Sequence, residues 1–415
     1  MNRISNAVLL GLLIIFISCK KSDKVTNNTT PIPGNNTEVT YLTKIVHNGV
    51  LTSIDELNIV KENQNSEPWK SELAALKASA SGNINYTMKG PFPNISRTGS
   101  GETSDLTGWS EHGRDATACY VQALLGYITG DVRYTQNAIS IINSWSNTLV
   151  SVGGNDVELL VGIQAPLWAQ AGEILANTNS GWQAADITKA KKMMTNIFLP
   201  AIDDFDPADG ANFSTSCIYA SMAMAVFTDD LRRFNLAWKA FNLQSGCPND
   251  FSLYKNIAAN GQNVESGRDQ VHSWSSYEML AGVAEIARHQ GLKPYTLGSN
   301  RLLTGVEYWC KYNLGQSVPF DVSVYRCRAG WGPWTNISAT DRGAPTTQGS
   351  VCNMVYHAYY RLNLIPNTSY TKLMANVMTS VVVDPTPRNG YGNPFIGDGL
   401  LHQIAPGEMP GTETE

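Results

Sequence analysis

The sequence has few charged residues and no surplus of positive charge. Charged side chains make up only 16% of the 415 residues, and 35 Asp and Glu outnumber 30 Lys and Arg, giving a formal net charge of -5. Proteins that bind nucleic acid in general carry a basic surplus, so we expect no nucleic-acid partner. The hydrophobic content of 42% is that of a globular chain, not of a disordered or collagen-like one.

Long hydrophobic runs are also missing. The apolar run Ala7–Ile17 has 11 residues, too few to span a bilayer as a helix. It follows Arg3 and ends at Ser18-Cys19, a pattern typical of a bacterial lipoprotein signal. We therefore expect residues 1–18 to be a signal peptide, with lipidation of the Cys19 thiol. The alternative is a plain signal peptide with an incidental cysteine. No later run approaches 18 apolar residues, so we expect membrane contact only through the lipid anchor.

Residues 19–41 are rich in Asn, Thr and Pro and almost free of large apolar side chains. Such a composition is typical of an extended, solvated tether. We expect it to hold one domain, residues 42–415, away from a membrane of the bacterial cell envelope, either in the periplasm or at the outer-membrane surface. We expect this domain to be a monomer.

Several cofactor and metal motifs are absent. The sequence has no P-loop, GxSxG, HExxH or GxGxxG in a strand context. It also has no C-x-x-C pair with the spacing of a zinc site. We therefore expect neither a cofactor nor a metal. Three cysteines lie in apolar helical segments and are expected to be buried free thiols: Cys119, Cys217 and Cys352. Three lie nearer loops, where one pair could be bridged: Cys247, Cys310 and Cys327.

Apolar residues recur at helical spacing through most of the chain after residue 41. The segments with this pattern are 116–129, 132–149, 157–176, 184–198, 212–227, 229–242, 270–290, 298–313, 350–362 and 371–382. Strand-like alternation is weak and is confined mainly to 317–328. Short connections make neighbouring helices antiparallel, and no residue-level repeat of fixed period argues for a solenoid. The pattern favours an all-α fold, an (α/α) toroid of antiparallel helix pairs with loops converging on a central cleft.

The stretch GQNVESGRDQVHSW carries the densest group of polar side chains. Glu265 precedes Arg268 by three residues and His272 follows it by four. If a helix spans 266–290, these three side chains project from one side at its N-terminal end. An Arg disfavours protonation of a neighbouring imidazole and leaves a neutral acceptor. The alternative is a capping cluster in which Ser266 caps the helix and Asp269 is its capping-box partner.

Two further groups precede helical segments. Asn212 and Tyr219 fall at helical spacing, so the amide could bind a substrate carboxyl, although an ordinary N-cap Asn explains it equally well. The segment Trp109–Asp115 combines an aromatic, an imidazole, a guanidinium and a carboxylate in a presumed loop, which favours a sugar-binding rim; as an alternative, Asp115 caps its helix. We expect these side chains to contact substrate: Trp109, His112, Arg114, Glu265, Gln262, Trp274, Tyr325 and Tyr359.

With these motifs in order, residues 105–362 resemble the alginate-lyase-type polysaccharide lyases of Bacteroidota. The resemblance is carried by DATACYVQALLGYITGD, AISIINSWSNTL, IYASMAMAVFTDD and, most specifically, ESGRDQVH followed by AEIARHQG. Better-known members carry an Asn-His pair, whereas here Asn212 precedes Phe213. They also place a Tyr seven residues after the Arg, where this chain has Ser275. The sequence is similar to the subgroup whose His follows the Arg by four.

The resemblance implies an α/α toroid that cleaves an anionic uronate polysaccharide, of alginate or glucuronan type, by β-elimination. Arg268 and Asn212 would stabilise the developing enolate-like charge, and His272 would be the base. Tyr219 would be the leading catalytic Tyr, with Tyr325 and Tyr359 behind it. Two other functions stay open on residues alone. One is a glycoside hydrolase that uses two carboxylates, such as Asp115 and Glu265; the other is a non-catalytic glycan-binding lipoprotein.

Overall fold

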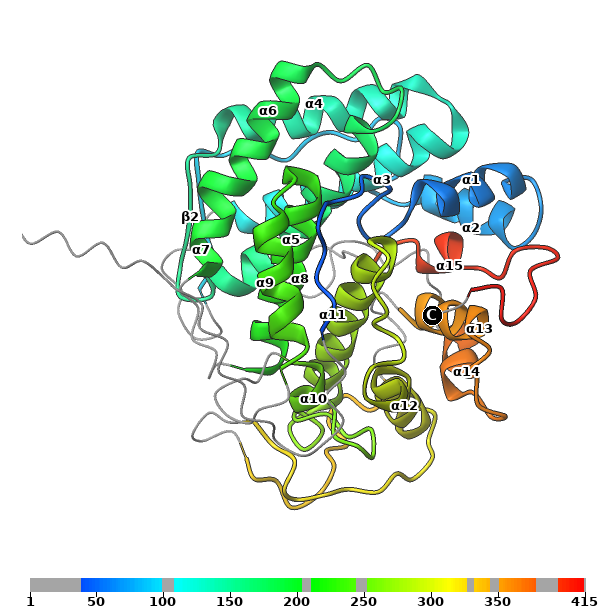
Figure 1. Ribbon diagram of the computed structural model, residues 1–415. Coiled ribbons are helices and arrows are strands. Elements are labelled where there is room, and N and C mark those ends of the chain that lie inside the picture. The colour runs from blue at the N-terminus through cyan, green and yellow to red at the C-terminus, as the bar shows by residue number, and fades with distance from the viewer. Residues whose placement is uncertain are drawn as a thin grey trace, which may run out of the picture. The chain divides into compact units, whose positions relative to one another are not determined.

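The computed structural model describes residues 39–98, 108–203, 210–243, 252–326, 332–343, 351–377 and 395–413. Helices dominate these residues, and two three-residue strands form one parallel pair. The elements are α1 (Ile54–Asn63), α2 (Trp69–Ala78), β1 (Asn94–Ser96), α3 (Trp109–Thr129), α4 (Val132–Thr148), β2 (Ser151–Gly153), α5 (Val157–Ala176), α6 (Ala184–Met193), the π-helical η1 (Met194–Phe198), α7 (Leu199–Asp203), α8 (Ala211–Thr228), α9 (Leu231–Phe241), α10 (Leu253–Asn256), α11 (Gln270–His289), α12 (Leu297–Asn313), α13 (Cys352–Arg361), α14 (Tyr370–Val377) and α15 (Asp398–Leu401). Figure 1 shows α5, α8, α9 and α11 side by side, and a long connection that follows α12.

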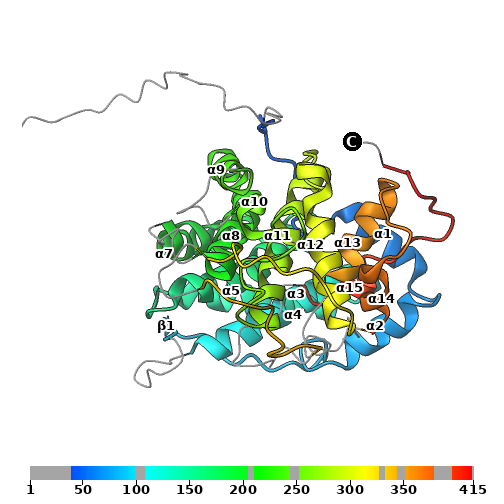
Figure 2. The same ribbon diagram turned by 90° about the horizontal axis from the view of Figure 1, so that it is seen from below.

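The most buried helices are α3, α5, α8 and α11, and neighbours in this series pack along their lengths (Figures 1 and 2). α5 and α8 run parallel, since Gly162 lies against Ser216 near their starts and Gly172 against Phe227 near their ends. α5 is long and apolar enough to cross a membrane, but 89% of its most apolar window is buried in the protein, as in a core helix. The predicted all-α fold is confirmed.

Residues 46–47 contact the C-terminal ends of three of these helices. The amide of Val46 donates to Oε1 of Gln290, the C-cap of α11, at 2.8 Å, and the Gln290 amide donates back to the Val46 carbonyl at 2.7 Å. His47 lies 3.1 Å from Glu173 near the end of α5 and 3.8 Å from Asp229, the C-cap of α8. Since these helices pack side by side and end together, their N-terminal ends lie together at the opposite end.

The strand pair places the start of α3 at that same N-terminal end. β1 precedes α3 and β2 precedes α5, and the two strands pair in parallel. The amide of Arg97 continues the ladder to the Gly153 carbonyl at 3.0 Å. Ser96 forms a bridge with Gly108, the N-cap of α3. The starts of α3, α5, α8 and α11 therefore gather at one end of the domain.

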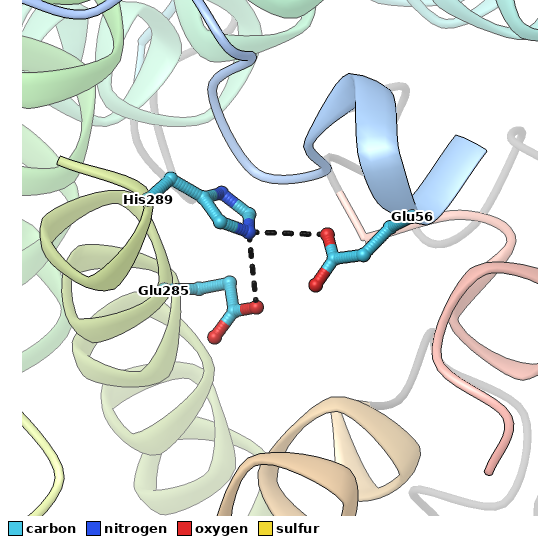
Figure 3. Close-up of side chains that lie close together, drawn as sticks. All are labelled: Glu56, Glu285 and His289. Atoms are coloured by element: carbon cyan, nitrogen blue, oxygen red, sulfur yellow. Dashed lines mark ion pairs between the residues drawn. The ribbon is translucent and has the colours of Figure 1, made fainter. Parts of the chain in front are cut away.

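At the C-terminal end of α11, α1 is joined to it by a buried network of ion pairs (Figure 3). His289 Nε2 lies 3.0 Å from Glu56 and 3.4 Å from Glu285. Arg288 Nη2 lies 2.5 Å from both carboxylates. The three residues in Figure 3 have the geometry of a possible metal site. However, the Arg288 guanidinium already occupies the position between the carboxylates and neutralises them, so the network is better suited to joining helices.

Three local expectations from the sequence are wrong. The segment Trp109–Asp115 is not a loop but the first turns of α3, because its polar side chains find partners inside the protein, as described below. The last long helix of the core begins at Gln270 and not at 266, since Asp269 and not Ser266 is its cap. No strand forms over 317–326; this connection is held by the Tyr308 hydroxyl of α12, which donates to the Pro319 carbonyl, and by Gln262, which binds Asp321.

The cysteine prediction is correct for three thiols and wrong for one. Cys119, Cys217 and Cys352 are buried and free. Cys310 is also buried and free, within α12, with its sulfur 3.9 Å from that of Cys352. Burial raises the pKa of the Cys310 thiol well above its usual value. The prediction that Cys310 lies nearer a loop was wrong, because Cys310 falls within the helical segment 298–313 and on the buried side of α12. The other two candidates, Cys247 and Cys327, lie outside the described residues.

Candidate functional site

The proposed catalytic residues on α11 lie in its cap and in the turn before it. Residues 264–268 form this turn, and Asp269 follows as the N-cap of the helix. One oxygen of the Asp269 carboxylate accepts from the amide of His272 at 2.7 Å, and the other lies 2.7 Å from His272 Nδ1. Burial alone would raise the pKa of Asp269, but the hydrogen bonds with His272 outweigh it and lower that pKa. Asp269 therefore holds both the helix start and the imidazole.

This arrangement fixes which nitrogen of His272 carries a free electron pair. An ionised Asp269 accepts a hydrogen bond, so Nδ1 carries the proton and Nε2 is the acceptor. Arg268 Nη2 lies 3.1 Å from Nε2 and is the donor to it. The side chains of Arg268 and His272 are 23% and 36% exposed, so a ligand can reach both. The structure thus brings Arg268 and His272 together, as their spacing of four residues predicted.

Glu265 contacts Arg268 and is completely buried. Its carboxylate is 3.5 Å from Arg268 Nη1 and 3.1 Å from Arg326 Nη1. Burial raises the pKa of Glu265, against the opposing effect of Arg326 and Arg268. The carboxylate positions both guanidinium groups, and it is too deep to contact a polymer as the sequence suggested.

Arg326 is a site residue that the sequence did not single out. It comes from the connection after α12, which Gln262 holds in place: Gln262 Nε2 donates to the Asp321 carbonyl at 2.9 Å, and the Asp321 amide donates to Gln262 Oε1 at 2.6 Å. Gln262 is fully buried and so acts as a clamp and not as a ligand-binding residue. One hint of a role for Arg326 was present in the sequence, its position next to the candidate Tyr325. There was no hint of the contact with Glu265, because the two residues are 61 positions apart.

Asn212 stands in the first turn of α8, at the same end of the domain. The N-cap Gly210 has φ 61° and ψ -179°, a conformation open essentially to glycine, and Ala211 has φ 48°. Backbone strain of this kind persists where the fold holds it in place and is concentrated at functional sites. Asn212 is 6% exposed, and its Oδ1 has no hydrogen-bond partner among the described residues. Because Gly210 is the N-cap, Asn212 does not cap α8.

The segment at the start of α3 is mostly buried. His112 is fully buried; Nδ1 lies 2.5 Å from Gln164 Oε1, and Nε2 accepts from Trp168 Nε1 at 2.9 Å. Burial lowers the pKa of His112 to about 4, so it stays neutral inside the protein. Trp109 is 8% exposed, and the Arg97 guanidinium lies 5.4 Å from its ring centre. The half-buried Arg114 completes this segment.

Asp115, on the inner side of α3, is used entirely within the fold. Its carboxylate accepts from the hydroxyl of Tyr86 at 2.8 Å and the indole of Trp145 at 2.8 Å. It also accepts from the amides of Lys89 and Gly90 at 2.8 and 2.9 Å. A carboxylate with four donors holds its neighbours in place and has no free lone pair for catalysis.

Three other aromatic side chains picked out by the sequence, Trp274, Tyr219 and Tyr359, lie in the core. Trp274 stacks on Trp309 with ring centres 4.1 Å apart. The Tyr219 hydroxyl accepts from Gln170 at 3.1 Å, and burial raises the Tyr219 pKa well above its usual value. The Tyr359 hydroxyl donates to the Tyr295 carbonyl at 2.8 Å. Tyr325, by contrast, is 37% exposed and adjoins Arg326 in the chain.

These observations define an all-α enzyme scaffold with Arg, His and Asn side chains at one end. The family model described as Alginate lyase matches residues 58–318, more than half of the chain. The protein therefore belongs to the alginate lyase family and is a polysaccharide lyase.

Solved structures agree with the predicted α/α toroid. An alginate lyase from Bacteroides ovatus is similar with a TM-score of 0.58 and 13% identity, over 84% of this chain and 100% of that one. Alginate lyase A1-III from Sphingomonas species A1, in a Tyr-to-Phe form complexed with tetrasaccharide, has a TM-score of 0.54 and 14% identity, over 86% of this chain and 97% of that one. No curated protein matches the chain.

Proposed function

We propose that this lyase cleaves a uronate polysaccharide by β-elimination at the site formed by Asn212, Arg268 and His272. The observation that carries the proposal is the arrangement of Asp269, His272 and Arg268: a carboxylate orients an imidazole whose acceptor nitrogen faces a guanidinium. Helix N-terminal ends carry partial positive charge, so the gathered starts of α3, α5, α8 and α11 add to the attraction for an anionic sugar.

The chemistry requires stabilisation of negative charge before a proton can leave. The proton at C5 of a uronate is too weakly acidic while the adjacent carboxylate keeps its full charge. Arg268 would bind that carboxylate, and the amide of Asn212 would donate a hydrogen bond to it, so that charge moving into it during proton removal is stabilised. Glu265 and Arg326 act through Arg268 as positioning residues.

Substrate binding would also prepare the base. In the free protein, Arg268 Nη2 donates to His272 Nε2. A uronate carboxylate is a stronger acceptor for a guanidinium than a neutral imidazole is. Arg268 would therefore turn toward the substrate and leave the Nε2 electron pair free to take the C5 proton. Asp269 would stabilise the resulting imidazolium, as the carboxylate partner of a catalytic histidine does.

The proton for the leaving oxygen would come from Tyr325. Among the three tyrosines proposed from the sequence, only its side chain is exposed, and the next residue, Arg326, reaches the site through Glu265. We expect Tyr325→Phe to lower kcat by about 10²-fold or more, the range for a lost general acid. Tyr41, which is 45% exposed and lies outside this site, offers a matched Tyr→Phe control. Unchanged kcat in Tyr325→Phe would assign the acid elsewhere.

The reaction class is tested by the ultraviolet absorbance of the products. Only elimination creates a double bond conjugated with the uronate carboxyl group, so absorbance must rise as the chain is cut. Polymannuronate, polyguluronate and glucuronan, assayed separately with product sizing, identify the polymer and the mode of cutting. Reducing ends appearing without this absorbance would indicate hydrolysis and contradict the proposal. Asp115 was one of the two carboxylates that the hydrolase alternative required. It is not available for catalysis, because its oxygens accept four hydrogen bonds within the fold.

We further propose that Cys19 is lipidated and anchors the enzyme in the bacterial cell envelope. The support is the sequence alone: the short apolar run, Ser18-Cys19 and the polar segment that follows. We expect cells producing Cys19→Ala to lose incorporation of labelled palmitate into this protein, while Cys119→Ala, at a buried thiol, leaves it intact. Equal labelling of Cys19→Ala and the wild type would contradict the proposal.

A further inference from the structure

Residues 332–343, here called the strap, are tied to the turn that carries Arg268. The amide of Ser338 donates to the Ser266 carbonyl at 2.9 Å, and the amide of Gln270 donates to the Thr340 carbonyl at 3.0 Å. The Gln270 side chain donates to the Ser338 carbonyl at 2.9 Å. The strap and the start of α11 therefore form one unit, although about 70 positions separate them in the chain.

A second anchor holds the far end of the strap on α12. Arg342 Nε donates to the Tyr312 carbonyl at 2.9 Å, and its guanidinium lies 4.0 Å from the centre of the Tyr312 ring. The Tyr312 hydroxyl donates to the Ser338 carbonyl at 3.3 Å. These contacts involve Ser338, Thr340 and Arg342, so the second half of the strap is fixed on α11 and α12.

One side chain of the strap, Trp334, lies directly against Gly267. A Cβ atom at residue 267 would lie 2.3 Å from Trp334 Cβ, 2.4 Å from its Cγ and 2.7 Å from its Cδ2. No side chain fits in that space, so the glycine allows the indole to approach the backbone. Gly267 immediately precedes Arg268, and Trp334 is therefore a neighbour of the proposed carboxylate-binding residue.

The environment of Trp334 differs from that of the core tryptophans. Its side chain is only half-buried, and it makes no hydrogen bond or ring contact with other described residues. Buried tryptophans usually find a partner for the indole N–H. Among the described residues, the following tryptophans donate it to an acceptor in the fold: Trp145, Trp168, Trp182, Trp238 and Trp309.

We infer that Trp334 binds a sugar ring of the uronate chain next to the residue whose carboxylate Arg268 holds. An indole combines a flat apolar face with one hydrogen-bond donor. The face suits the C–H side of a pyranose, and the N–H suits a hydroxyl or carboxylate of the same sugar. This inference rests on the proposed function and adds a binding position to it. Trp334 takes no part in proton transfer, so it contributes equally to the bound substrate and the transition state.

Equal binding of both states has a defined kinetic signature: its loss raises KM and leaves kcat unchanged. We expect Trp334→Ala to raise KM for the polymer about tenfold, the effect of losing about one aromatic contact, with kcat near the wild-type value. Trp334→Phe, which keeps a ring but loses the donor, should raise KM less. Thr335→Ala, an exposed position next to it on the strap, is the matched control and should leave both parameters unchanged.

Gly267→Ala supplies an independent variant, because the added methyl must displace the indole. We expect it to raise KM as Trp334→Ala does, and the double variant should be no worse than either single one, since both remove the same contact. Effects that multiply in the double variant would overturn the inference. So would an unchanged KM, or a loss confined to kcat, in a Trp334→Ala protein whose thermal unfolding matches the wild type.

The wild type separates failure of this inference from failure of the proposed function. If the wild type forms no unsaturated product from any uronate polymer, the proposed function is wrong. If it does, and Trp334→Ala and Trp334→Phe both keep its KM, only the assignment of Trp334 is wrong. Calorimetric binding of a uronate hexamer to His272→Ala and to the double variant His272→Ala/Trp334→Ala gives a readout without turnover; equal affinities would also overturn the inference.

Discussion

His272→Ala is expected to lower kcat by about 10²–10⁴-fold, the contribution of a positioned general base, while the polymer still binds. The reason is that Nε2 is the acceptor in the Asp269–His272–Arg268 arrangement, and alanine leaves no group to take the C5 proton. Arg268→Ala should cost about 10²–10³-fold, or about 3 kcal/mol of transition-state stabilisation. Most of this loss should appear in kcat, since charge builds up on the substrate carboxyl group only as the proton leaves.

Matched controls exist for both changes. The His47 side chain is 33% exposed and lies at the C-terminal ends of α5 and α8, while the Arg233 side chain is 22% exposed and pairs with Asp203. Alanine at either position should leave kcat unchanged. Steady-state kinetics on correctly folded protein provides the measurement. A His272→Ala enzyme with near wild-type kcat would show that the base is another group, and Tyr325 would then be the first candidate.

Arg288→Ala is expected to destabilise the protein by about 3–5 kcal/mol, the range for removing one partner of a buried ion pair. The variant leaves Glu56 and Glu285 buried without the guanidinium that lies 2.5 Å from each. His272 and His289 are 17 residues apart on one helix, a rise of about 25 Å, so the active site is not touched. Urea unfolding gives the loss directly. Arg133→Ala, at a surface ion pair with Asp131, is the control and should show no measurable loss.

The same network predicts how stability depends on pH. Burial alone would raise the pKa of Glu285, but Arg288 and His289 lower it to about 2 from its ordinary value of 4.5. A carboxyl group whose pKa is lower in the folded state stabilises the protein above its unfolded pKa. That stability is lost as the pH falls from about 4.5 to about 2. The free-energy difference between wild type and Arg288→Ala should shrink over this range, and a constant difference would contradict the role given to Arg288.

Much of the fold could be predicted from the sequence because helical periodicity is a local signal. The apolar spacing located α4 and α5 within a residue of their observed bounds. It failed at the start of α3, where polar residues suggested a loop. His112 and Asp115 are buried there because distant residues supply their hydrogen bonds, which no local pattern reveals.

The candidate site divides in the same way. The sequence by itself determined that Arg268 and His272 share one side of a helix start, because residues four apart on such a turn must be neighbours. Only the tertiary structure decided that Tyr325 is exposed while Tyr219 and Tyr359 are buried. It also decided that Arg326 pairs with Glu265, 61 positions away, and that Trp334 packs on Gly267. Both contacts join a loop to the start of α11, and they depend on the packing of the whole domain and not on the spacing of residues along the chain.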